Sequence, residues 1–143
     1  MARKWKVLFL CTGNSCRSQM AEGWARCLKG ASIEPFSAGL VAHGLNPRAV
    51  QVMAERGVDI SGQASKTLAS LDGQVFDVII TVCGDAEERC PMFPGRTLRI
   101  HRGFDDPPKL AREARNEDEA LNHFRRVRDE IEAYIRTLPE AFG

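Results

Sequence analysis

Residues 7–23 read VLFLCTGNSCRSQMAEG and carry the side chains best suited to chemistry. Cys11 directly follows an apolar run, and Arg17 and Ser18 open a segment with helical spacing. Main-chain N–H groups at the start of a helix bind anions, and their positive potential, together with Arg17, favours the thiolate form of a cysteine. We therefore interpret Cys11 as a nucleophile that faces a bound oxyanion.

The residues between Cys11 and Ser18 fit a loop that wraps an anion. Gly13 and Asn14 tolerate the positive φ angles that such a loop needs. Arg17 can donate two parallel hydrogen bonds to the oxyanion, and the Ser18 hydroxyl can bond the Cys11 sulfur, both as nucleophile and as leaving group. The expected substrate-binding residues are Thr12, Gly13, Asn14, Ser15, Cys16 and Arg17.

Strands and helices must position this loop. Apolar and β-branched runs predict strands at residues 5–10, 33–37, 76–82 and 97–101. Apolar residues at three- and four-residue steps predict helices at residues 18–29, 47–56 and 116–138. Asn46 and Pro47 are a typical cap and first residue of the second helix. The alternation predicts an α/β domain with a parallel sheet of about four strands and helices on both faces, in which ligands bind at the carboxyl ends of the strands.

Composition and charge indicate one cytoplasmic domain over residues 1–143. The chain is 43% hydrophobic and 27% charged, and its net charge of +1 argues against a nucleic-acid partner. The apolar run near the start is too short for a signal peptide or a membrane span, so we expect no membrane association, and we expect a monomer. The five cysteines should be reduced thiols in the cytoplasm.

Other cysteines and the histidines indicate no metal site. His43, His101 and His123 lack the spacing of metal ligands, so we expect no catalytic metal. The Cys16 side chain is expected to pack beneath the loop, and Cys27 to lie in the hydrophobic core.

Two carboxylates precede a pair of prolines in FDDPP. Asp before Pro is common in turns, so Asp105 and Asp106 fit an ordinary turn. A leaving oxygen nevertheless needs a proton, and a carboxylic acid near the loop can supply it. Either residue is a candidate for that acid.

The stretch CTGNSCRSQMAEGW at residues 11–24 resembles the phosphate-binding loop of the low-molecular-weight protein tyrosine phosphatase fold. It is most similar to the thioredoxin-coupled arsenate reductases of that fold. The resemblance continues through SAG (37–39), HGLNP (43–47), CGDAEERCP (83–91) and GFDDP (103–107). It therefore covers nearly the whole chain and implies the fold of those proteins.

The resemblance also implies an activity, the reduction of arsenate to arsenite in arsenic detoxification. In the resembling reductases three cysteines act in sequence, and they match Cys11, Cys83 and Cys90 of this chain. By this match, Cys11 attacks arsenate, Cys83 then attacks Cys11 and releases arsenite, and Cys90 attacks Cys83. The Cys83–Cys90 disulfide is reduced by thioredoxin, so the implied partners are arsenate and thioredoxin, with no bound cofactor. The family pattern favours Asp106, directly before the first proline, as the acid, and leaves Asp105 as the alternative.

The spacing of Cys83 and Cys90 adds a geometric constraint. If the residues between them formed a helix, a rise of about 1.5 Å per residue would separate their Cα atoms by roughly 10 Å. A disulfide needs less than about 7 Å. We therefore expect this segment to unwind or loop out when the two cysteines are oxidised.

A departure from the family pattern concerns potassium. Some resembling reductases bind potassium beside the loop through residues that match Asn14, Glu22 and Ser37, but the fourth position, an Asp there, aligns with Lys66. We expect the Lys66 ammonium to replace the ion. The alternative is that Lys66 points into solvent.

Two rival functions remain open. A phosphatase acting on phosphotyrosine would use the same loop, but it needs no second thiol, and this chain lacks the Tyr that phosphatases usually carry after DDP. An arsenite-binding sensor could hold arsenite with three cysteines, although nothing in the sequence resembles a DNA-reading helix.

Overall fold

A four-stranded parallel sheet forms the centre of the computed structural model, which describes residues 4–90 and 97–143, the side chains at positions 85, 87 and 89 excepted. The strands are β1 (Trp5–Cys11), β2 (Ile33–Gly39), β3 (Val78–Thr81) and β4 (Leu98–His101), in the order β2-β1-β3-β4. All three pairings are parallel. The predicted α/β class with four parallel strands is confirmed.

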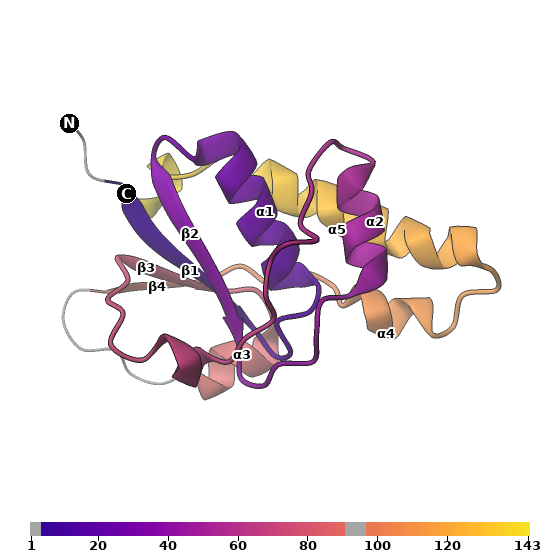
Figure 1. Cartoon of the computed structure of the whole chain (residues 1–143), viewed down its shortest axis with the longest axis horizontal. Helices are drawn as coiled ribbons and strands as arrows, with labels where there is room; N and C mark the ends of the chain where they lie inside the picture. The colour runs from indigo at the N-terminus through magenta and orange to yellow at the C-terminus, as the bar shows by residue number, and fades with distance from the viewer. Residues whose placement is uncertain (1–3, 91–96) are drawn as a thin grey trace.

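Helices cover the two faces of this sheet. They are α1 (Arg17–Lys29), α2 (Pro47–Ala54), α3 (Gly84–Arg89), α4 (Pro107–Ala111) and α5 (Glu117–Ile135), with short 3₁₀ helices η1 (Leu68–Leu71) and η2 (Glu140–Phe142). In Figure 1, α1, α2 and α5 lie on one side of the sheet, and α3 lies on the other side near the carboxyl ends of β1 and β3. No helix in the described ranges is long and apolar enough to cross a membrane.

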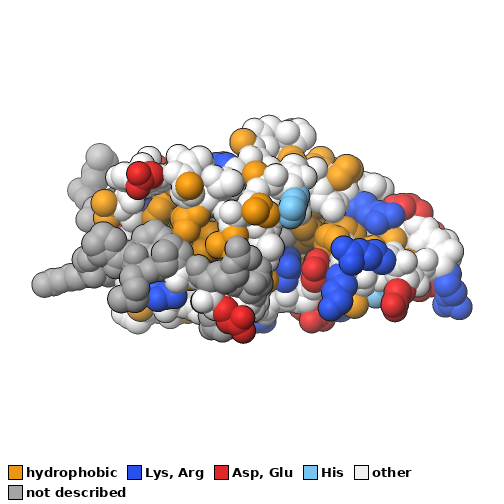
Figure 2. Space-filling model, turned by 90° about the horizontal axis from the view of Figure 1, so that it is seen from below, with side chains coloured by type: hydrophobic (Ala, Val, Ile, Leu, Met, Phe, Trp, Pro, Cys, Tyr) orange, Lys and Arg blue, Asp and Glu red, His pale blue; other side chains and the backbone are white. Residues whose placement is uncertain are grey.

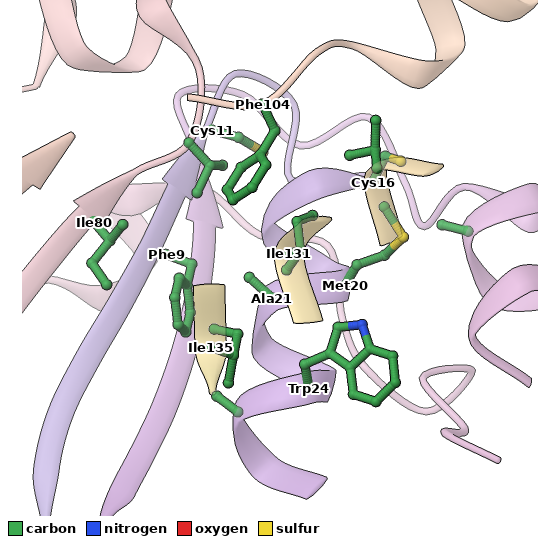
Figure 3. Close-up of a cluster of buried hydrophobic side chains, with 14 of the residues drawn as sticks. Phe9, Cys11, Cys16, Met20, Ala21, Trp24, Ile80, Phe104, Ile131 and Ile135 are labelled. Atoms are coloured by element: carbon green, nitrogen blue, oxygen red, sulfur yellow. The ribbon is translucent and has the colours of Figure 1, made fainter. Parts of the chain in front are cut away.

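From Val7 onward, the central strand β1 is buried on both faces. Its residues Val7, Leu8, Phe9 and Leu10 are fully buried, which explains why the sequence shows a continuous apolar run instead of alternation. Figure 3 shows Phe9 in one buried cluster with Ile131 and Ile135 of α5 and Ala21 of α1. Cys11 is therefore the last residue of a rigid strand.

Several element ends differ from the predictions. β3 ends at Thr81 and not at residue 82, while Phe76 lies outside the strand and packs against Phe36 at 5.4 Å between ring centroids. The helices α3 and α4 were not predicted, because six and five residues are too few to show an apolar period. α2 begins as predicted, with Asn46 accepting two main-chain hydrogen bonds.

Helix α5 is fixed to α2 by two arginines. The Arg128 side chain is only 5% exposed and donates to the carbonyl of Val52 and to Glu55 Oε1, each at 2.9 Å. Arg125 also bonds Glu55, at 2.8 Å from Oε2. The hydrogen bond from Arg125, helped by that from Arg128, holds the pKa of Glu55 below its ordinary value. α5 is therefore a firmly held element beside the site.

Candidate active site

The loop between β1 and α1 carries its carbonyl groups outward. Main-chain N–H groups of residues 40–46 donate to four carbonyls at 2.9–3.2 Å: Leu40 to Cys11, Val41 to Thr12, His43 to Gly13 and Asn46 to Ser15. The Asn14 carbonyl accepts from Gln19 Nε2 at 3.0 Å. Because a trans peptide points its N–H opposite to its C=O, the amides of the loop turn toward the concave side. Successive amides arranged in this way form an anion-binding nest.

Gly13 and Asn14 contribute to the loop in different ways. Asn14 adopts φ 48°, the left-handed conformation that was predicted for it. Gly13 is not among the positive-φ residues, so that part of the prediction is wrong. Gly13 is required for space instead, because a Cβ there would collide with the imidazole of His43. His43 thus covers the outer side of the loop.

The Cys11 sulfur is surrounded by hydrogen-bond donors. Cys11 is buried, and its Sγ accepts from the Asn14 main-chain N–H at 3.2 Å. Ser18 Oγ lies 2.7 Å from this sulfur and accepts from Asn14 Nδ2 at 2.8 Å. Since the serine oxygen already accepts from Asn14, its own hydrogen is available to Cys11. These donors stabilise negative charge on the sulfur, which a nucleophile and a leaving group both need.

Two glutamines, the buried Gln19 and the partly buried Gln63, support Asn14. Gln19 Nε2 donates to Asn14 Oδ1 at 3.1 Å, and Gln19 Oε1 accepts from Gln63 Nε2 at 2.8 Å. The main-chain N–H of Lys66 also donates to Asn14 Oδ1, at 2.8 Å. Sequence reasoning missed Gln19 and Gln63, because no spacing distinguishes them from solvent-facing residues. Only the complete burial of Gln19 reveals its role.

Arg17 links the loop to residues 102–106, the segment that carries the two candidate acids. Its Nη1 donates to the Phe104 carbonyl at 3.0 Å, and its Nη2 lies 3.8 Å from Asp106 Oδ2. Asp105 has a different partner, Arg126 of α5, at 2.9 Å. Of the two candidate acids, Asp106 therefore faces the arginine that is expected to bind the oxyanion.

Cys83 and Cys90 stand at the two ends of α3. Cys83 lies beyond β3 and caps the helix, with its Sγ accepting from Ala86 N at 3.4 Å. The same sulfur lies 3.2 Å from Thr12 Oγ1, so Cys83 is beside the loop. Burial raises the pKa of the partly buried Cys90, against the opposing effect of Arg99. Neither cysteine is in a disulfide here, and the predicted unwinding or looping out of α3 remains a prediction.

The other two cysteines, Cys16 and Cys27, differ in burial. Cys16 is buried at the start of α1, next to Met20 in Figure 3, and burial raises its pKa, so it stays a neutral thiol. The expected burial of Cys27 is wrong, because Cys27 is exposed. It lies in the last turn of α1, whereas the buried part of the helix ends at Ala25.

Lys66 and Glu22 meet beside Asn14. The buried Glu22 carboxylate accepts from Ser37 Oγ at 2.5 Å and from Arg26 at 2.6 Å. Lys66 Nζ lies 4.0 Å from Glu22 Oε1 and donates to the Ala64 carbonyl at 3.0 Å. Its side chain is 25% exposed, so the ammonium is partly withdrawn from solvent. Within residues 4–90 and 97–143, no cluster of three or more His, Cys, Asp or Glu side chains could hold a metal ion.

The face at which the strands end is mixed in character. Figure 2 shows apolar side chains in the middle of this face, while acidic and basic side chains gather together at one end. Val41, from the segment that borders the loop, is 42% exposed. The described surface around the loop is therefore not a uniformly basic one.

The sequence matches the family described as low molecular weight phosphotyrosine protein phosphatase over residues 6–142. The chain belongs to this family. Within this chain, Cys11 ends β1 and Arg17 begins α1 at the two ends of one loop, and Asp106 lies 3.8 Å from Arg17. Cys83, held next to the loop by Thr12, is an additional thiol.

Members of the family that reduce arsenate are similar to this chain. The arsenate reductase of Bacillus subtilis (strain 168) is 50% identical over 134 residues, which cover 94% of each chain. A solved structure described as an arsenate reductase in the phosphate binding state has 32% identity and a TM-score of 0.77, over 99% of this chain and 100% of that one. A thioredoxin-dependent arsenate reductase of Corynebacterium glutamicum has 29% identity and a TM-score of 0.72, over 98% of this chain and 62% of that one.

Proposed function

We propose that this protein reduces arsenate to arsenite through a relay of Cys11, Cys83 and Cys90 that thioredoxin recycles. The observation that carries the proposal is the position of Cys83, whose sulfur lies 3.2 Å from the hydroxyl of Thr12, the residue next to Cys11. A phosphatase returns its nucleophile unchanged, whereas a reductase must deliver two electrons and needs a second thiol near the first. The names of the similar proteins support the same activity.

The first step is a substitution at arsenic. The amides of the loop and Arg17 bind the arsenate oxygens, and the Cys11 thiolate attacks the arsenic atom to form a sulfur–arsenic bond. One arsenate oxygen leaves and needs a proton, which Asp106 supplies, so that water departs. The 3.8 Å between Asp106 and Arg17 supports this role, because both side chains then face the same anion.

The second step is the reduction. The Cys83 thiolate attacks the Cys11 sulfur, a sulfur–sulfur bond forms, and the electron pair of the sulfur–arsenic bond remains on arsenic. Arsenic passes from the pentavalent to the trivalent state and leaves as arsenite. The Thr12 hydroxyl and the Ala86 N–H, at 3.2 and 3.4 Å from Cys83 Sγ, favour the attacking thiolate.

The last steps restore the nucleophile. The Cys90 thiolate attacks Cys83 and releases Cys11 as a thiolate, which leaves a Cys83–Cys90 disulfide. A dithiol partner of the thioredoxin class then reduces this disulfide and is itself oxidised. The helical spacing of Cys83 and Cys90 requires α3 to unwind in this step, which would also bring the disulfide to the surface.

A second candidate function, hydrolysis of aryl phosphates, follows from the family itself. The loop, Arg17 and Asp106 would serve a phosphate ester as they serve arsenate, and neither Cys83 nor Cys90 would be needed. The two activities therefore respond differently to the same substitutions. An arsenite-binding sensor, in contrast, would show no steady turnover at all.

The test measures arsenite formed from arsenate with thioredoxin, thioredoxin reductase and NADPH. We expect steady turnover by the wild type, none by Cys11→Ser, and at most one turnover by Cys83→Ser and Cys90→Ser. Cys27→Ser is the matched control and should behave as the wild type, because Cys27 is exposed on α1. Mass spectrometry of the oxidised wild type should find Cys83 joined to Cys90.

Two outcomes would contradict the proposal. Multiple turnover by Cys90→Ser at the wild-type rate would exclude the relay. Absence of arsenite formation by the wild type, together with efficient hydrolysis of an aryl phosphate, would assign the protein to the phosphatases.

A further inference from the structure

The acid-bearing segment, residues 102–106, rests on one stripe of α5. The stripe consists of residues four positions apart, which share a face of a helix: Arg126, Glu130 and Tyr134. The segment contacts this stripe through an ion pair and through aromatic rings. It is therefore held by a helix that itself is anchored to α2 by the buried Arg128.

The ion pair involves Asp105. Its Oδ2 accepts from Arg126 Nη2 at 2.9 Å, and Arg126 Nη1 donates to Glu130 Oε2 at 2.7 Å. Arg126 is thus fixed at both of its terminal nitrogens. With these partners, Asp105 is directed onto α5 and away from the loop.

The aromatic contact lies at the other end of the stripe. The guanidinium of Arg102 stacks 4.4 Å from the Phe104 ring centroid and 5.8 Å from that of Tyr134. The two rings themselves meet edge to face at 6.2 Å. These contacts hold the start of the segment, so the ion pair at Asp105 sets the direction of its end.

Asp106 faces the opposite way. Its backbone is extended, with φ −91° and ψ 99°, and successive side chains of an extended segment point to opposite sides. When Asp105 is bound to Arg126, Asp106 must point toward Arg17, and its carboxylate does lie 3.8 Å from that guanidinium. The direction of one aspartate therefore determines the direction of the other.

We propose that Arg126 is a positioning residue that selects Asp106 as the acid by holding Asp105 on α5. This inference rests on the proposed role of Asp106, but it does not depend on the substrate being arsenate. Without Arg126 the segment could rotate and present either carboxylate to the loop. The correct acid would then face the leaving oxygen for only part of the time.

The effect of losing Arg126 should be kinetic and not structural. Its side chain is 44% exposed and that of Asp105 66%, and ion pairs at such exposure add little to folding stability. Arg126→Ala should therefore fold normally. Arg125→Ala is a matched control, because Arg125 is the preceding residue on α5 and its side chain is 32% exposed in an ion pair with Glu55, away from the acid segment.

The test compares two aryl phosphates that differ in their need for an acid. Phenol, with a pKa of about 10 like tyrosine, needs a proton to leave, whereas 4-nitrophenol is a much better leaving group. We expect Arg126→Ala to lower kcat for phenyl phosphate by about fivefold, with KM changed less than twofold and with a smaller loss for 4-nitrophenyl phosphate. Arg126→Lys should recover part of the loss, and Arg125→Ala should behave as the wild type. Arsenate reduction by Arg126→Ala should fall in parallel with phenyl phosphate hydrolysis.

A double-substitution cycle tests whether Arg126 acts on Asp106 through Asp105. Asp105→Asn should cause a loss similar to that of Arg126→Ala, and the two together should cost no more than either alone. Equal losses on both aryl phosphates, additive losses, or an unchanged kcat would each overturn the inference. If the wild type hydrolyses aryl phosphates with the expected Arg126 effect but forms no arsenite, the proposed function fails and this inference stands. A wild type inactive on all three substrates would refute both.

Discussion

Replacing Ser18 with alanine tests the interpretation of Cys11 most directly. Ser18 is fully buried, and its hydroxyl lies 2.7 Å from the Cys11 sulfur. A hydrogen bond to a charged group contributes about 1.5–3 kcal/mol, and each 1.36 kcal/mol changes a rate about tenfold. Every step in which the Cys11 sulfur carries or regains negative charge should therefore slow by about 10- to 150-fold.

The same substitution removes a second hydrogen bond. Asn14 Nδ2 donates to Ser18 Oγ at 2.8 Å, and Asn14 is fully buried, so alanine leaves this amide without its acceptor. An unsatisfied buried donor costs about 1–3 kcal/mol of unfolding free energy. Ser18→Ala should thus show a moderate loss of stability together with the larger kinetic defect.

Two measurements separate these effects. Urea denaturation gives the change in unfolding free energy, and the rate of Cys11 alkylation by iodoacetamide, followed by mass spectrometry at neutral pH, reports the reactivity of the sulfur. Ser65→Ala is the control, because Ser65 bonds the loop carbonyl of Gly13 at 3.4 Å and does not touch the sulfur. If Ser18→Ala lost stability but kept alkylation and turnover within twofold of the wild type, the reasoning about Cys11 would be refuted.

Three other substitutions test the remaining parts of the site. Thr12→Val should slow arsenite release by about tenfold while arsenate affinity changes little, because the hydrogen bond to Cys83 serves only the second step. Rapid-quench kinetics would measure the release rate, and an unchanged rate would show that Thr12 has no part in the relay. Asp106→Asn should lower kcat by about 10² or more with KM nearly unchanged, and a larger loss in Asp105→Asn would reverse the assignment. Turnover should be insensitive to exchanging sodium for potassium at fixed ionic strength, and Lys66→Asp should create a potassium response; strong potassium activation of the wild type would contradict the replacement of the ion by Lys66.

The sequence was sufficient for the elements with long apolar patterns. From Val7 to Cys11, β1 is buried at the centre of the sheet, so this part of the strand is a continuous apolar run and its end at Cys11 could be placed within one residue. α3 escaped prediction because it has only six residues and is capped by a cysteine sulfur, which is not among the usual caps. The exposure of Cys27 could not be predicted either, because it depends on where the core ends along α1.

The same contrast between local sequence patterns and contacts set by the fold applies to the site. The residues of the loop are consecutive, so their types and order identified Cys11, Arg17 and Ser18 as a unit. Contacts between distant segments gave no such signal. Gln63 meets Gln19 across 44 positions, and Arg126 meets Asp105 across 21, and only the fold brings these side chains together.

Residues 40–46, which border the loop, hold it through main-chain hydrogen bonds, so this hold on the loop does not depend on the side chains of these residues. Leu40, Val41 and His43 donate through their backbone, so an exchange of the Leu40 or Val41 side chain leaves the geometry around Cys11 intact. Evolution or design can therefore change these side chains, and with them which substrates reach the loop, without changing the surroundings of Cys11. Proline is the exception, because it lacks the N–H on which each of these bonds depends.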